Sequence, residues 1–105
     1  MKEKLTHYNR LFKIQKAEIE KYCLRGSFLE AYHYYEVYAF KPLVANLRAV
    51  HTPTKQGFYL KHIYQDLPDH LTKQVEGLIR VNSVEDIRVR LDKIESILND
   101  LTIDG

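Results

Sequence analysis

The hydrophobic residues of the chain recur mostly at steps of three and four, which is the spacing of amphipathic α-helices. Residues 5–23 predict a first helix, with the apolar residues Leu5, Tyr8, Phe12, Ile19, Tyr22 and Cys23 on one side and Lys13, Lys16, Glu18, Glu20 and Lys21 on the polar side. The tripeptide Arg25-Gly26-Ser27 then predicts a tight turn, because glycine can take a left-handed conformation at the end of a helix. Ser27 is expected to cap the next helix, since Glu30 follows it three residues later.

A second helix is predicted over residues 28–50, and apolar side chains surround most of it. They are Phe28, Leu29, Tyr32, Tyr35, Val37, Phe40, Leu43, Val44, Leu47 and Val50. A helix of this kind belongs at the centre of a fold. Pro42 lacks the N–H group that would bond to the carbonyl of Tyr38, so we expect a kink near Pro42.

Three further helices are predicted after a loop of turn-forming residues. A short helix covers residues 58–67, a fourth helix begins at Pro68 and ends near Asn82, and a fifth opens at Ser83. The fifth has the most regular apolar stripe, which is Val84, Ile87, Leu91, Ile94, Leu98 and Leu101. No strand pattern is present. The chain is therefore expected to form an all-α fold, an antiparallel helical bundle of about five helices, as a single domain over residues 1–105.

Composition and charge exclude some partners without selecting one. The chain has 105 residues, and 16 Lys and Arg against 14 Asp and Glu give a net charge of +2, which is too small to indicate nucleic-acid binding by itself. Its single cysteine, Cys23, cannot form an intrachain disulfide, and the N-terminal segment lacks the apolar core of an export signal. No apolar run is long enough to span a membrane. We therefore expect a cytoplasmic protein without a membrane partner.

Aromatic and cationic residues of the second predicted helix share one stripe on a helical wheel. The stripe lies within and beside a stretch, residues 37–65, that contains no Asp or Glu. Stacking tyrosines beside Arg and Lys can accept the base and the phosphates of a nucleotide. The candidate ligand-binding residues are therefore Tyr34, Tyr38, Lys41, Arg48, Lys55 and Lys61.

Two other interpretations of these residues stay open. Tyrosines on a central helix commonly belong to the core or to a subunit interface. Arg48 can instead tie the end of its helix to a carboxylate such as Asp66.

No catalytic or metal-binding constellation is complete in the sequence. His51, His62 and His70 are eleven and eight residues apart, which matches no compact metal motif. Cys23 lies on the apolar stripe of the first helix and lacks the neighbours that activate a nucleophile. We therefore expect no catalytic residues, no metal ligands and no cofactor in this chain.

Several short motifs follow one another in a recognisable order. They are Lys41-Pro42-Leu43-Val44 through Leu47-Arg48, then Thr52-Pro53, Phe58 and Asp66-Leu67-Pro68. In this order the chain resembles the C-terminal helical region of a family of small bacterial and archaeal nucleotidyltransferases. In that family a catalytic domain of the DNA polymerase β type precedes the helical region. The resemblance covers about residues 17–101.

The resemblance implies a non-catalytic domain that forms the C-terminal part of a larger nucleotidyltransferase. Such a domain packs beside the catalytic domain, helps to form the substrate cleft and can dimerise, as related helical domains of the HEPN (higher eukaryote and prokaryote nucleotide-binding) fold do. The family's catalytic domain has a Gly-Ser turn and an Asp-x-Asp pair that holds magnesium. Here Gly26-Ser27 leads only to Phe28-Leu29-Glu30, so magnesium is expected only in the catalytic domain and this chain alone is not expected to transfer nucleotides.

The resemblance also defines the expected partners and the alternatives. The partners are the nucleotidyltransferase catalytic domain, a second copy of the chain, and a nucleotide or another polyanion. One alternative is a freestanding HEPN-like protein that acts on nucleic acid. However, HEPN ribonucleases place an Arg four to six residues before a His, whereas only two residues separate Arg48 and His51. The other alternative is a helical dimerisation module that binds no small molecule.

Overall fold

The computed structural model describes residues 2–104, and it describes their side chains except at residues 2–7, 9, 56 and 102–104. The elements are α1 (Lys2–Leu24), α2 (Phe28–Tyr35), the π-helical turn η1 (Glu36–Phe40), α3 (Lys41–His51), the 3₁₀ segment η2 (Pro53–Phe58), α4 (Ile63–Asp66), α5 (Asp69–Ile79) and α6 (Val84–Asp104). No strand occurs in this part of the chain. The all-α fold predicted from the sequence is therefore confirmed.

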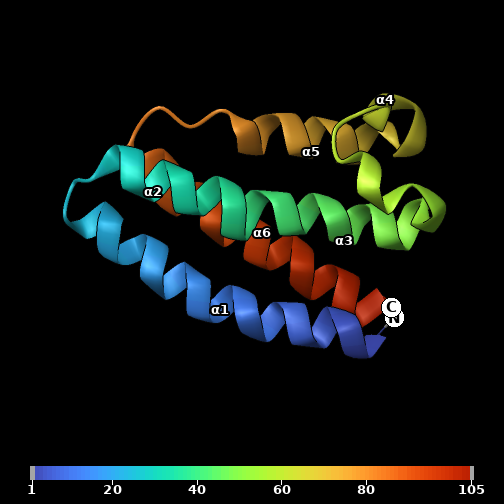
Figure 1. Cartoon of the computed structure of the whole chain (residues 1–105), viewed down its shortest axis with the longest axis horizontal. Coiled ribbons are helices and arrows are strands. Elements are labelled where there is room, and N and C mark those ends of the chain that lie inside the picture. Colours follow the sequence, from blue (N-terminus) through green and yellow to red (C-terminus); the bar gives the residue numbers. More distant parts are fainter. Residues whose placement is uncertain (1, 105) are drawn as a thin grey trace.

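The long helices form an antiparallel bundle (Figure 1). Helix α1 is followed by the continuous helix α2–η1–α3, which runs back along it, and α5 and α6 again alternate in direction. Helix α6 packs against both α1 and α2, so α1 and α6 lie side by side and the start of one is near the end of the other. None of the described helices has the length and hydrophobicity that crossing a membrane requires.

The turn between α1 and α2 confirms one local prediction and corrects another. Gly26 takes the expected left-handed conformation with φ of 70°, and its N–H donates to the carbonyl of Cys23 at 3.0 Å. Ser27, in contrast, makes no side-chain cap. Its ψ of 79° lies outside the extended region that a capping serine normally occupies, so the predicted Ser27 cap is wrong.

The helix that contains Pro42 continues through the proline without being divided. Directly before it, η1 forms a wider turn, in which the N–H of Lys41 donates to the carbonyl of Glu36, five residues back. This turn accommodates the proline, whose ring and missing N–H disrupt a regular α-helical turn. The irregularity expected near Pro42 is thus a π-helical turn. Its extra residue rotates α3 by about 100° relative to a regular continuation of α2.

The predicted short helix over residues 58–67 is mostly wrong. Only Ile63–Asp66 is helical as α4, and turns precede it. Tyr59 and His62 have positive φ values of 54° and 61°, a conformation that an α-helix cannot contain. Helix α5 also ends at Ile79, three residues before the predicted end near Asn82.

The N-terminus of α6 has the start signal that the sequence predicts. Ser83 Oγ accepts a hydrogen bond from the N–H of Asp86 at 3.1 Å. The Asp86 carboxylate in turn accepts one from the N–H of Asn82 at 2.9 Å. Two N–H groups at the helix start are therefore bonded, which fixes the point at which α6 begins.

The core lies between α1, α2–η1–α3 and α6. Its fully buried members include Ile19, Leu43, Val44, Ile87, Leu91 and Ile94. Polar contacts attach the neighbouring helices: Lys16 on α1 bonds to Asp92 and Glu95 on α6 at 2.8 and 3.0 Å, and the buried hydroxyl of Tyr35 donates to the carbonyl of Leu78 on α5 at 2.7 Å. The central position predicted for the second helix is therefore confirmed.

Helix α6 provides the test of this packing. Leu91→Ala and Ile94→Ala should each lower the free energy of unfolding by about 2 to 5 kcal/mol, because both side chains are 0% exposed and truncation leaves a cavity. Chemical denaturation of each variant measures the change. Val89→Ala, on a side chain that is 57% exposed, is the control and should leave the midpoint close to that of the unchanged protein. Equal midpoints for all three variants would contradict the observed packing.

Candidate functional site

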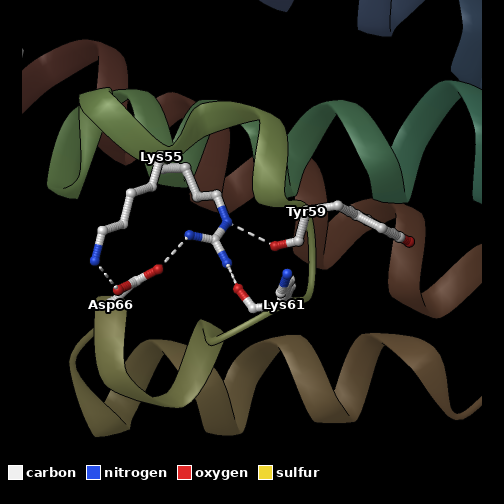
Figure 2. Close-up of polar contacts among 5 residues, drawn as sticks. Lys55, Tyr59, Lys61 and Asp66 are labelled. Atoms are coloured by element: carbon white, nitrogen blue, oxygen red, sulfur yellow. Dashed lines mark hydrogen bonds and ion pairs between the residues drawn. The ribbon is translucent and has the colours of Figure 1, made fainter.

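Arg48 is the most deeply buried charged residue at the candidate site. It lies near the C-terminal end of α3, and its side chain is 0% exposed. Its guanidinium donates three hydrogen bonds to the segment that follows: Nε to the carbonyl of Tyr59 at 2.6 Å, Nη2 to the carbonyl of Lys61 at 2.6 Å, and Nη1 to Oδ2 of Asp66 at 2.7 Å (Figure 2). Arg48 therefore has the role that the sequence left open as an alternative, and its guanidinium faces protein groups and not solvent.

These bonds explain why residues 59–62 form turns. The carbonyls of Tyr59 and Lys61 accept bonds from Arg48 and so do not take part in a helical ladder. The planar guanidinium presents its donors in a fixed fork, which lets one side chain bind two carbonyls and a carboxylate. Tertiary contacts made from α3 thus override the helical pattern of the local sequence.

Asp66, at the end of α4, is the third group that binds Arg48, and we call Arg48 with its three bonds the anchor. Its side chain is 4% exposed, and Lys55 of η2 donates to its other oxygen, Oδ1, at 3.3 Å (Figure 2). The hydrogen bond from Arg48 holds the pKa of the Asp66 carboxyl below its usual value, against the opposing effect of desolvation, and Lys55 adds to the lowering. The carboxylate therefore stays charged and bonded near neutral pH.

We call the segment of residues 53–66 the basic loop. Two lysine–aromatic pairs involve this loop, one within it and one between it and α3. Lys41 Nζ lies 5.7 Å from the ring centroid of Tyr59, and Lys61 Nζ lies 5.7 Å from that of Phe58. Both lysines are exposed, and the Phe58 side chain is 43% exposed. Since Arg48 bonds to the carbonyls of Tyr59 and Lys61, it fixes the backbone of one member of each pair.

The two predicted tyrosines have different neighbours. Tyr34 stacks between Tyr22 of α1 and Tyr38, with ring centroids 5.1 and 5.6 Å apart and interplanar angles of 11° and 17°. The guanidinium of Arg25 lies 5.7 Å from the ring centroid of Tyr22. The predicted stripe is thus divided: its tyrosines pack along α1, whereas its cations contact the basic loop.

The π turn is the physical reason for this division, because a wheel drawn at 100° per residue assumes a regular helix. The structure brings together four of the predicted residues, which are Lys41, Arg48, Lys55 and Lys61. Tyr22, Phe58 and Tyr59 are not among the site residues predicted from the sequence. Tyr22 belongs to the predicted apolar stripe of the first helix, and Phe58 lies in a segment predicted to be helical.

Within the described part of the chain, no three His, Cys, Asp or Glu side chains are grouped so that they could hold a metal ion. Comparison of the chain with protein-family models, with curated proteins and with solved structures gives no significant match. The arrangement of the side chains is therefore the basis for the function proposed below, together with the resemblance of the short motifs.

Removing the anchor should destabilise the protein strongly. Arg48→Ala leaves Asp66 without its main partner and two carbonyls without donors, so we expect a loss on the order of 3 to 5 kcal/mol in the free energy of unfolding. Arg48→Lys should recover only part of this loss, because lysine lacks the fork. Urea denaturation measures both. Arg80→Ala removes an exposed arginine and is the control; an Arg48→Ala midpoint equal to that of the control would rule out the anchoring role.

The lowered pKa of Asp66 also predicts a dependence of stability on acid pH. The contribution of the charged carboxylate is fully present above its ordinary pKa of 3.8 and is lost as the pH falls from there through the lowered pKa of the folded state. Over this range the free energy of unfolding should fall more steeply for the unchanged protein than for Asp66→Asn. Denaturation at a series of pH values gives both slopes, and Asp100→Asn, on an exposed side chain of α6, provides the reference. Equal slopes for the unchanged protein and Asp66→Asn would contradict the assignment.

Proposed function

We propose that this chain is a non-catalytic helical domain that binds a phosphate-bearing substrate and assembles with a nucleotidyltransferase catalytic domain of the DNA polymerase β type. The observation that carries the proposal is the basic loop, which a buried arginine holds beside α3 so that the exposed lysines Lys41 and Lys61 each lie against an aromatic ring. The resemblance of the short motifs between Lys41 and Pro68 supports the family assignment. In this proposal the chain supplies binding groups and the partner domain supplies magnesium and the chemistry.

The physical chemistry of the loop suits a phosphate-bearing ligand. Lys41 and Lys61 are exposed, and the half-exposed Lys55 is ion-paired with Asp66. The exposed ring of Phe58 can stack on a base, since every nucleobase has an aromatic face. A loop that is already ordered loses less conformational entropy on binding than a mobile one. Arg48 contributes to binding only by positioning these groups.

The hairpin between α1 and α2 supports the assembly part of the proposal. Leu24 and Leu29 are 74% and 81% exposed and flank the Gly26 turn. Large exposed apolar side chains at one end of a bundle are favoured positions for contact with another protein surface. We assign this end to the contact with the catalytic domain, and a second copy of the chain is the alternative occupant.

Nucleotide binding can be tested by following backbone amide shifts while ATP is added. The proposal predicts saturable shifts in the basic loop and at Lys41, with an affinity that falls as salt is added. Lys41→Ala and Lys61→Ala should each weaken binding by about two- to five-fold, the range expected for the loss of one exposed ionic contact.

Lys93→Ala is the matched control, because it removes the same charge from the exposed surface of α6. It should leave the affinity unchanged. Shifts spread evenly over the surface, or equal losses in all three variants, would show attraction to net charge only. Either result would refute the proposed site.

A further inference from the structure

A small groove lies between α1, η1, the start of α3 and α6, and it has a volume of about 240 Å³. The described residues that line it are mainly apolar and include Leu11, Phe12, Ala39 and Pro42. No Lys, Arg, Asp or Glu is among the described lining residues. A groove of this composition favours an uncharged ligand, because a charge would lose its hydration without gaining an ionic partner.

Tyr38 forms one border of the groove and is also one end of the tyrosine stack. One face of its ring is covered by Tyr34, at 5.6 Å between centroids, and the side chain is 41% exposed. At the other end of the stack, Arg25 lies over Tyr22. Among the described residues of the stack, Tyr38 is therefore the end that borders the groove.

Asn46 supplies a polar group at the groove. The residue is 3% exposed, and its Nδ2 donates to the carbonyl of Pro42 at 2.8 Å. That bond fixes the orientation of the amide, because a carbonyl can only accept. Because its Nδ2 group is bonded to Pro42, the side-chain oxygen is the group that Asn46 can offer to a donor in the groove.

We propose that this groove binds an uncharged, planar heteroaromatic molecule that carries a ring N–H group. The ring stacks on Tyr38, and its N–H donates to the side-chain oxygen of Asn46. An apolar cavity of about 150 Å³ holds benzene, so the larger volume here fits a two-ring system such as indole. The chain contains no Trp, so a second copy cannot supply an indole side chain. The site goes beyond the function proposed above, since it uses none of the lysines of the basic loop.

Indole is a suitable probe, because the chain lacks Trp and indole can be excited at wavelengths beyond the absorption of the eight tyrosines. The groove should bind indole saturably. Indene has the same shape without the N–H and should bind about two- to ten-fold more weakly, which corresponds to one hydrogen bond. Binding of indole at or below the affinity of indene would overturn the role of Asn46.

Variants locate the site. Tyr38→Leu should abolish most of the binding, and Tyr64→Leu, on a tyrosine that is 66% exposed at a different site, should not. Asn46→Leu should remove the difference between indole and indene. If Asn46→Leu does not fold, the comparison of the two probes in the unchanged protein still decides the matter. Equal effects of Tyr38→Leu and Tyr64→Leu, or the absence of saturation, would refute the site.

Discussion

The burial of one guanidinium determines how residues 59–66 attach to the end of α3. A charged group that is 0% exposed is tolerated only where hydrogen bonds replace its hydration, and Arg48 obtains them from Tyr59, Lys61 and Asp66. All three partners lie 11 to 18 residues after it in the sequence. The basic loop, which includes α4, is consequently held against the end of α3, and α5 continues from that position. The same interaction fixes the two lysine–aromatic pairs.

Pro42 imposes a second constraint, on the other side of the same helix. The wide turn that accommodates the proline adds one residue between Tyr38 and Arg48, so residues before and after η1 meet different neighbours. Tyr34, before this turn, and Tyr38, within it, stack along α1, and Tyr38 borders the groove, whereas the cations after the turn contact the basic loop. Two separate candidate surfaces thus result from one irregularity in the central helix.

The sequence was sufficient where structure depends on local signals. The stripe of α6 and its start at Ser83 were predicted, because helical period and N-terminal bonds involve residues only three or four apart. It was insufficient at residues 58–62, where the carbonyls that a helix would use bond to Arg48 instead. Of the candidate site, the grouping of the cations was predicted, but the position of the tyrosines was not. A helical wheel assumes a constant rotation per residue and therefore cannot represent a π turn. Nucleotide binding stays a prediction.

The internal use of Arg48 also determines what kind of recognition the basic loop can provide. Arginine is the residue whose fork matches phosphate geometry, and here that fork is buried and bonded to protein groups. The cations left at the surface are lysines, which act as point charges on flexible stems. A site of this type responds to the amount of negative charge and to an adjacent aromatic face more than to the geometry of a single phosphate. In the proposed function, the loop therefore accepts a range of nucleotide-like ligands, and the selection of one substrate falls to the proposed partner domain.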